Sequence, residues 1–244
     1  MPEWLSRTEL LIRKEGIEKL KKSRVAIFGI GGVGGNTVEA LIRAGLGEID
    51  LIDNDVFSPS NLNRQLFATR KTLGKYKVEA ARTRILDINP DAKVNIYKIF
   101  YAKETSKLID FSKYDYVVDA IDTVKSKTEI IINAKNADVP VISAMGAGNK
   151  MNPLGFIVSD ISKTTVCPLA RAVRYELKKC GIKKVKVVYS KEPPIKSLTK
   201  YERQKRDEIE TRFLKGSISF VPSAMGLIIA CEVVKDLINY EIKN

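Results

Sequence analysis

The glycine-rich stretch GIGGVGG, residues 29–35, follows a short apolar run and precedes a helical pattern. Gly29, Gly31 and Gly34 have the spacing G-x-G-x-x-G, in which glycines permit a tight turn, close approach of backbone to phosphate, and close packing of a helix on a sheet. Asp53 ends the next apolar run, where a carboxylate can accept hydrogen bonds from ribose hydroxyls. This pattern predicts a nucleotide site, and it fits NAD as well as ATP.

The stretch SNLNRQLF, residues 60–67, favours ATP. An enzyme that cleaves ATP between its α- and β-phosphates must neutralise charge that builds up on them, and Arg, Lys and a magnesium-holding carboxylate do this. The sequence supplies Arg64, Lys77 early in the following helix, and Asp122 at the end of the strand YVVDAID. A dehydrogenase keeps its cofactor intact and needs no such set, so these residues predict ATP cleavage.

These residues need a scaffold, and apolar runs alternate with helical patterns as far as residue 145. This alternation predicts an α/β fold with a doubly wound, mostly parallel Rossmann-like sheet. We expect strands at 25–28, 49–52, 93–100, 116–121 and 139–145, and helices at 37–44, 75–88, 103–108 and 126–137.

The alternation weakens after Gly148, where a charged segment contains predicted strands at 154–161 and 184–190 and a helix at 165–180. The apolar tail 222–238 is predicted to be a helix that returns to the core. We expect one domain, divided into an N-terminal helical arm (1–22), a nucleotide-binding core (23–149), a basic excursion on the substrate side (150–216) and a C-terminal helix (217–244).

The composition excludes several kinds of catalytic and metal site. The chain has no histidine, which excludes His-dependent catalysis and His metal ligands, and its three cysteines form no CxxC pair, so neither zinc nor a disulfide framework is expected. No signal peptide is apparent, and the longest apolar stretch, 218–231, is short for a bilayer span of roughly 20 residues. We therefore expect a protein of the reducing cytoplasm without a membrane partner.

The basic charge is concentrated late in the chain. Residues 178–215 contain thirteen basic and five acidic side chains, in a protein of formal net charge +13. A local excess of this kind is typical of a surface that meets a polyanion, although a solvated basic face would look the same.

Taken together, the motifs GIGGVGG, LIDNDVFSPSNLNRQLF, GKYKVEAA and DAID resemble the ThiF/MoeB-type adenylation domain, whose fold is shared with ubiquitin-activating enzymes. The resemblance covers residues 5–150 and implies ATP and Mg²⁺. It implies that Asp53 binds the ribose, that Asp122 serves magnesium and the α-phosphate, and that the remaining contacts to ATP come from Gly29, Gly31, Gly32, Gly34, Asp55, Asn61, Arg64 and Lys77. Arg7, in LSRTELL, takes the place of an arginine that reaches the partner subunit's ATP in this family, which implies a homodimer.

The second half of the chain resembles the tRNA threonylcarbamoyladenosine dehydratase subgroup, through SAMGAGNKMNPLGFIVSD, CPLARAVRYELKKCG and GSISFVPSAMGLIIA. This resemblance implies that ATP adenylates the carboxylate of threonylcarbamoyladenosine 37 in tRNA, after which the carbamoyl group closes a ring and expels AMP. An intramolecular nucleophile needs no enzyme cysteine. The basic segment would then meet tRNA phosphates through Lys183, Lys184, Lys186, Arg203, Lys205 and Arg206. The resemblance leaves open a monovalent-cation site and a sulfur-transfer protein partner.

Three other functions compete with this interpretation. A carrier-protein adenylating enzyme could use Cys167 as acceptor, whereas the subgroup usually has an acidic residue at that position. A non-enzymatic nucleotide sensor or tRNA-binding protein would not need Arg64, Lys77 and Asp122 together. An NAD-dependent dehydrogenase is disfavoured by SNLNRQ and by the absence of histidine.

Overall fold

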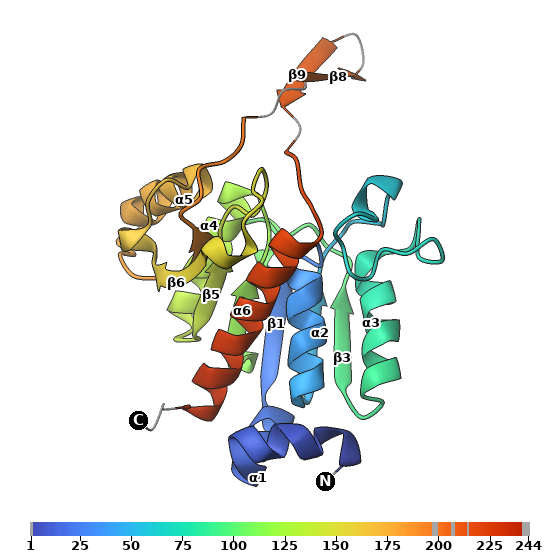
Figure 1. Cartoon of the computed structure of the whole chain (residues 1–244). Coiled ribbons are helices and arrows are strands. Elements are labelled where there is room, and N and C mark those ends of the chain that lie inside the picture. Colours follow the sequence, from blue (N-terminus) through green and yellow to red (C-terminus); the bar gives the residue numbers. More distant parts are fainter. Residues whose placement is uncertain (1, 197–199, 206–207, 214, 241–244) are drawn as a thin grey trace.

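The computed structural model of the chain describes residues 2–196, 200–205, 208–213 and 215–240. Its centre is a seven-stranded sheet in the order β3-β2-β1-β4-β5-β7-β6 (Figure 1). Six strands are parallel, and β6 runs antiparallel to β7. The strands are β1 (Arg24–Phe28), β2 (Glu48–Ile52), β3 (Lys93–Tyr97), β4 (Tyr116–Asp119), β5 (Val141–Ala144), β6 (Phe156–Asp160) and β7 (Lys186–Ser190). The predicted doubly wound, mostly parallel sheet is confirmed.

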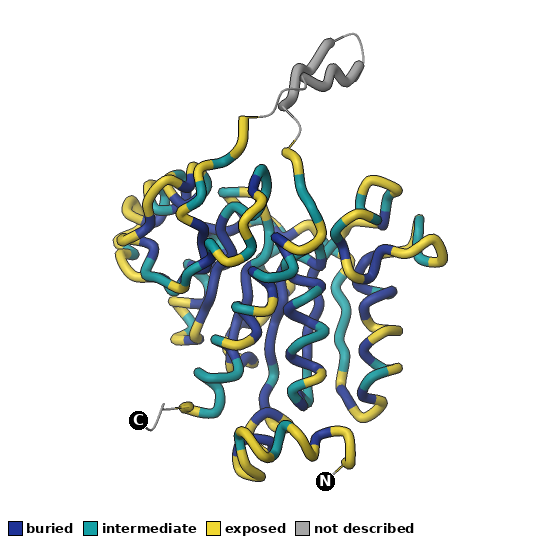
Figure 2. The backbone as a smooth tube through the Cα atoms, viewed as in Figure 1, coloured by how far each residue is buried: buried dark blue, intermediate teal, exposed yellow. Residues whose placement is uncertain are grey.

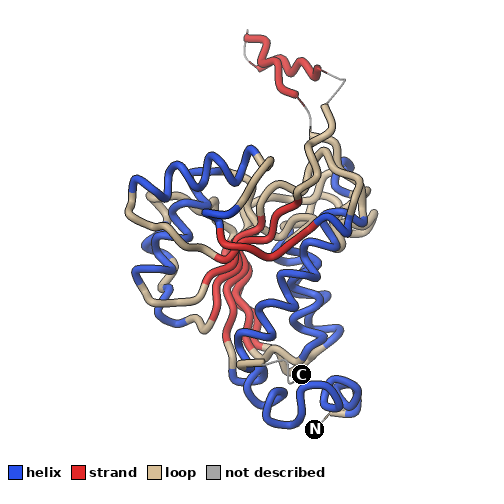
Figure 3. Tube along the Cα trace, turned by 60° about the vertical axis from the view of Figure 1, so that its left-hand side comes forward, coloured by secondary structure: helices blue, strands red, loops and turns tan. Residues whose placement is uncertain are grey.

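Helices cover both faces of this sheet, which Figure 3 shows nearly edge-on. One face packs against α2 (Gly34–Ala44), α3 (Lys77–Ile88) and α6 (Phe220–Ile238). The other packs against α4 (Val124–Asn136) and α5 (Pro168–Lys179). Every residue of the central strands β4 and β5 is buried, whereas the edge strand β3 is mostly of intermediate burial (Figure 2). Coverage on both faces explains why these strands are apolar runs and do not alternate with polar residues.

The predicted helix at 103–108 is wrong. Only a short 3-10 helix, η3 (Ser106–Leu108), forms there. The hydroxyl of Thr105 accepts a hydrogen bond from Ala102 N (2.9 Å) and donates one to Phe100 O (2.8 Å). A Thr side chain that bonds to nearby backbone in this way competes with helical hydrogen bonding, so the segment stays a turn.

The predicted C-terminal helix is present as α6, and it crosses α2 closely. A Cβ added at Gly226 would lie 2.4 Å from Val33 O, and Thr37 Oγ1 donates to Gly226 O (3.0 Å). Pro222 is the third residue of α6, a position whose N–H has no partner within a helix. This crossing brings the first turn of α6 to the glycine-rich turn.

Two parts of the chain, the N-terminal helices and a hairpin, lie outside the layers. At one end of the sheet, η1 (Glu3–Leu5) and α1 (Ser6–Lys22) lie beside the amino-terminal ends of the strands (Figure 1). The strands β8 (Lys200–Lys205) and β9 (Glu208–Phe213) form an antiparallel hairpin that the sequence analysis did not predict. We call the carboxyl-terminal ends of the parallel strands the carboxyl edge and their opposite ends the amino edge.

Candidate active site

The glycine-rich turn lies at the carboxyl edge, between β1 and α2. Gly29 has φ 90°, and a Cβ there would lie 2.9 Å from Ala120 O. A Cβ at Gly34 would lie 1.8 Å from Gly29 O, so the first turn of α2 can follow the strand this closely only without a side chain. Beside Gly31, by contrast, an added Cβ would meet only Gln65 Nε2, at 3.8 Å. The turn therefore offers open backbone beside a helix N-terminus, as phosphate binding requires.

Asp53 lies next to this turn and is joined to Lys77 and Asp55. Its Oδ2 accepts from Ile30 N (2.7 Å) and its Oδ1 from Asp55 N (2.8 Å). The Lys77 ammonium is buried, 2.7 Å from Asp55 Oδ2 and 3.9 Å from Asp53 Oδ2. Burial raises the pKa of Asp53, while Lys77 and the two backbone N–H groups oppose that rise. The structure thus brings these three residues together, as the sequence analysis expected.

Arg64 is held in the SNLNRQLF loop by two acceptors. Its Nη1 donates to Ser60 O (2.8 Å) and to Asn63 Oδ1 (2.8 Å). Within the described residues, its Nε and Nη2 have no hydrogen-bond partner, so they can meet an anion. Asn61 caps η2 (Pro59–Asn61), because its Oδ1 accepts from Ser58 N (3.0 Å). The amide of Asn61 therefore shapes the loop that carries Arg64.

Gln65 is a site residue that the sequence analysis missed. The residue is 9% exposed, and its Oε1 is the only buried side-chain nitrogen or oxygen without a hydrogen-bond partner in the described part of the chain. A buried acceptor without a donor is costly, so Oε1 needs a donor that the described residues do not supply, whereas Nε2 is the atom of this amide nearest to Gly31. The signal in the sequence was its place directly after Arg64.

The loop after β4 carries Asp122, which is exposed at the carboxyl edge. Beneath it lies a buried ion pair between Lys127 and Asp119, which was not predicted from the sequence. Lys127 Nζ is 2.9 Å from Asp119 Oδ2, with both side chains 0% exposed, and it also donates to Ile121 O (2.9 Å). Asp119 further accepts from Ser143 Oγ (2.5 Å). This buried pair fixes the path of the loop that presents Asp122.

Arg7 lies on α1 at the amino edge, the opposite end of the sheet from the glycine-rich turn (Figure 1). The helix is attached there by a hydrogen bond from Gly47 N to Leu20 O (3.1 Å). The structure therefore does not bring Arg7 together with the site residues of its own chain.

Comparison with known proteins assigns the family. The model of the ThiF family matches residues 5–244.

The chain belongs to the ThiF family.

Its relatives include tRNA threonylcarbamoyladenosine dehydratase of Bacillus subtilis (strain 168), 45% identical over 244 residues that cover 98% of this chain and 96% of the relative. The enzyme of the same name from Haemophilus influenzae is 41% identical over 169 residues, 69% of this chain and 65% of the relative. The crystal structure of E. coli tRNA N6-threonylcarbamoyladenosine dehydratase, TcdA, in complex with ATP matches with a TM-score of 0.84 and 28% identity, covering 97% of this chain and 94% of that one. The resemblance to the ThiF/MoeB-type adenylation domain and to the tRNA threonylcarbamoyladenosine dehydratase subgroup is confirmed.

Of the six basic residues expected at tRNA, the three whose side chains are described do not lie near the glycine-rich turn of this ThiF-family chain. Lys183 and Lys184 lie between α5 and β7, and Lys186 begins β7, all at the amino edge. Lys186 Nζ is already 2.7 Å from Asp236 and 3.3 Å from Glu232. The side chains of Arg203 and Lys205, in β8, are not described, and Arg206 lies outside the described residues.

Cys167 precedes α5 and is 4% exposed. A thiol this buried is poorly placed to accept an acyl group from a carrier protein. No group of three or more His, Cys, Asp or Glu side chains that could hold a metal ion occurs in the described part of this ThiF-family chain. Across the same residues, no helix is both long and apolar enough to cross a membrane.

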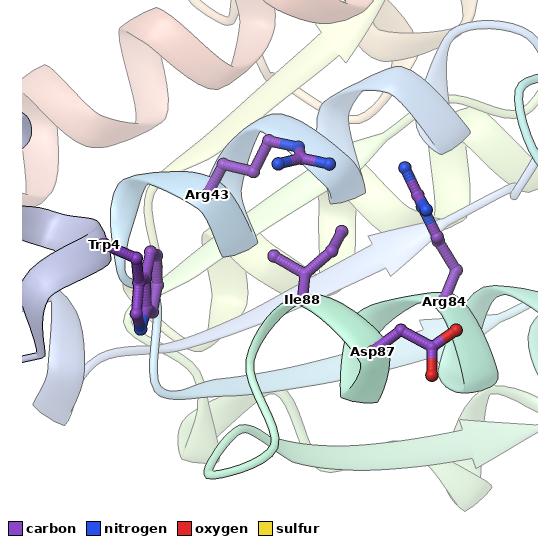
Figure 4. Close-up of a pocket in the computed structure, with 5 residues that line it drawn as sticks. All are labelled: Trp4, Arg43, Arg84, Asp87 and Ile88. Atoms are coloured by element: carbon purple, nitrogen blue, oxygen red, sulfur yellow. The ribbon is translucent and has the colours of Figure 1, made fainter.

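A hollow of about 460 Å³ lies at the amino edge, between η1 and the ends of α2 and α3 (Figure 4). It is lined by Trp4, Arg43, Arg84, Asp87 and Ile88. Both guanidiniums are bound to Glu39, at 2.7 Å and 3.0 Å. Because Glu39 and Asp87 balance the two arginines, this hollow has no excess charge to attract an anion.

Proposed function

We propose that this chain is an ATP-dependent tRNA threonylcarbamoyladenosine dehydratase. The observation that carries the proposal is the full-length match at 45% identity to the Bacillus subtilis enzyme of that name. The geometry supports it, because the glycine-rich turn, Asp53, Lys77 and Arg64 lie together at the carboxyl edge, where ligands bind in doubly wound folds.

In the proposed reaction, the carboxylate of threonylcarbamoyladenosine 37 attacks the α-phosphorus of ATP and releases pyrophosphate. The neighbouring carbamoyl group of the same nucleoside then attacks the acyl-adenylate, loses a proton and expels AMP, which closes a ring. The net change in the nucleoside is the loss of one water. The enzyme's main task is to hold two groups of one substrate in contact, and proximity of this kind replaces a protein nucleophile.

Different site residues bind different parts of ATP. The backbone at Gly31 and Gly32 and the α2 N-terminus bind phosphate oxygens, and Asp53 accepts from the ribose hydroxyls. The side chains of Arg64 and Lys77, with the amide of Asn61, neutralise or hold the phosphates that leave. Asp122 fits magnesium, because an exposed carboxylate at this edge is a hard oxygen ligand that leaves positions for water and phosphate. When bound, magnesium would neutralise phosphate charge there.

Arg7 is proposed to complete the ATP site of a second protomer in a homodimer. It lies at the amino edge of its own sheet, at the opposite end from its own glycine-rich turn. The only glycine-rich turn that it could approach is therefore that of another chain. Such a dimer turns the amino edge, with Lys183 and Lys184, toward the partner's site. These two lysines, together with the β8–β9 region, are our proposed surface for tRNA, whereas the ion pairs of Lys186 argue against a tRNA contact. A tRNA substrate is consistent with a cytoplasmic protein.

The test is mass spectrometry of tRNA nucleosides after incubation with the purified protein, ATP and Mg²⁺. We expect a nucleoside lighter by one water, together with one AMP and one pyrophosphate for each ring closed. Unmodified tRNA and the Arg64→Ala variant serve as controls. No lighter nucleoside from fully modified tRNA would refute the proposal, and ATP–pyrophosphate exchange stimulated by a carrier protein ending in Gly-Gly would favour the alternative.

A further inference from the structure

Two segments flank the β8–β9 hairpin, and we call them the stems. The incoming stem, residues 191–196, follows β7, and the outgoing stem, residues 215–219, precedes α6. Both are tied to the turn that follows β5. Asn149 N donates to Gly216 O (2.8 Å), Asn149 Oδ1 accepts from Gly216 N (2.5 Å), and Asn149 O accepts from Ile195 N (2.7 Å). One residue therefore joins the incoming stem to the outgoing one.

The backbone at Asn149 suits this role. Its φ of 57° lies in the left-handed region, which asparagine tolerates better than most residues with a side chain. In that conformation its N–H and carbonyl meet opposite stems. A second tie reinforces the incoming stem, because Glu192 accepts from Met151 N (3.0 Å) and Asn152 N (3.1 Å) through its two carboxylate oxygens.

The outgoing stem is also tied to the SNLNRQLF loop. Asn63 Nδ2 donates to Ser217 O (2.9 Å), while Asn63 Oδ1 accepts from Arg64 Nη1 (2.8 Å). A single amide thus bridges the stem and the guanidinium. The same region is closely packed, since a Cβ added at Gly32 would lie 3.2 Å from Pro222, which is in the first turn of α6, and 3.4 Å from Arg64 O.

We propose that Asn63 and Asn149 are positioning residues that hold the Arg64 guanidinium to the stems of the β8–β9 hairpin. Neither residue has to touch ATP. The contacts run from Asn149 to Gly216, along the stem to Ser217, and through Asn63 to Arg64. The proposal rests on the assignment of Arg64 to the phosphates of ATP, and it explains why a polar loop lies between the glycine-rich turn and the excursion.

The consequence is a selective effect on nucleotide affinity. Arg64 is assigned to the phosphates that leave, so loosening it should weaken a triphosphate more than AMP. The hydrogen bond from Asn63 to Ser217 O joins neutral groups, and such a bond contributes about 0.5–1.5 kcal/mol, which corresponds to a change in affinity of about two- to tenfold. A residue with only a structural role would weaken both nucleotides alike or lower the stability of the fold.

The experiment compares the affinities of α,β-methylene-ATP and AMP by calorimetry in the presence of Mg²⁺. Asn63→Ala removes both hydrogen bonds of the bridge. Asn149→Gly keeps the left-handed backbone but loses the acceptor for Gly216 N, and Asn149→Asp restores that acceptor. We expect the first two variants to weaken the analogue about three- to tenfold and AMP less than about twofold, with Asn149→Asp recovering most of the loss. Arg64→Ala gives the largest shift that the bridge can produce.

Equal losses for both nucleotides, or an Asn149→Gly variant that binds the analogue as wild type does, would overturn the proposal. Because these measurements need no tRNA, they separate it from the proposed function. Wild-type protein that fails to dehydrate tRNA would refute the function while leaving the affinity ratio to decide the bridge. A wild-type protein that dehydrates tRNA, together with variants whose ratio of analogue to AMP affinity is unchanged, would support the function and refute the bridge.

Discussion

Replacing Lys127 by methionine should strongly destabilise this fold. Lys127 Nζ lies 2.9 Å from Asp119 Oδ2, and both side chains are 0% exposed. Methionine fills a similar volume but leaves the Asp119 carboxylate buried with only neutral donors, Ser143 Oγ and Ile121 N. It also leaves Ile121 O without its ammonium donor. Removing one partner from a buried pair typically costs about 3–5 kcal/mol, because the remaining charge is desolvated and uncompensated.

The assay is urea denaturation, in which the midpoint and slope give the free energy of unfolding. Lys125→Met is the matched control, because Lys125 is an exposed lysine on the same helix, and surface substitutions usually change stability by less than about 0.5 kcal/mol. The double variant Asp119→Asn with Lys127→Met removes both charges, so it should recover part of the loss, and the double-mutant cycle gives the coupling between the two side chains.

A free energy of unfolding for Lys127→Met within about 1 kcal/mol of the Lys125→Met value would refute this reasoning. The reasoning would also be refuted if the double variant lost more free energy of unfolding than the two single variants lose in sum. Since Ile121 precedes Asp122 directly, we also expect slower turnover in Lys127→Met under conditions where it is fully folded. Turnover equal to wild type there would mean that the pair does not position Asp122.

Four further predictions concern the site. Arg64→Ala should lower the rate of tRNA dehydration on the order of 10²–10³-fold without unfolding the protein, and a near wild-type rate would exclude a role at the transition state. Mixing Arg7→Ala with Arg64→Ala protomers should restore part of the activity, since one heterodimer site is then intact; verified heterodimers without recovery would refute a shared site. Affinity for ATP should fall as the pH drops, because ribose binding needs the Asp53 carboxylate. Since burial raises the pKa of Asp53, this fall should begin at a higher pH than for an exposed aspartate. The same raised pKa contributes stability to the folded free protein at low pH, where Asp53 is protonated, and this stability is lost as the pH rises through the folded-state pKa. Asp53→Asn should remove this pH step in titrations of affinity. Reversing Lys183 and Lys184 to Glu should reduce the salt dependence of tRNA binding and leave ATP affinity unchanged, whereas an unchanged salt slope would assign both to a solvated face.

Much of the site could be predicted from the sequence because its signals are local. The glycines of the turn need a conformation and a closeness that only glycine permits, and Asp53 follows its strand directly. Lys77 begins the next helix after the SNLNRQLF loop. Each of these residues is placed by a neighbouring element whose pattern is continuous in the chain, so the alternation of strands and helices was sufficient to bring them to one edge.

The remaining features depend on partners that are distant in the chain. Lys186 belongs to the basic segment by sequence, yet Asp236 and Glu232 of α6 neutralise it once α6 packs on the sheet. Lys127 is an ordinary helical lysine by pattern, and only the end of β4 reveals its buried partner.

The ties of Asn63 and Asn149 to the stems join residues that are remote in sequence, so no local pattern marks them. Periodicity and backbone preference are properties of short segments, and the sequence by itself therefore determined the strands of the central sheet, the helices that cover it and the glycine-rich turn, but neither the turn at 103–108 nor the β8–β9 hairpin. Which charges are paired, which amides are bridged and which edge each lysine occupies were decided by the tertiary structure, because only the packed layers bring those side chains within hydrogen-bonding distance.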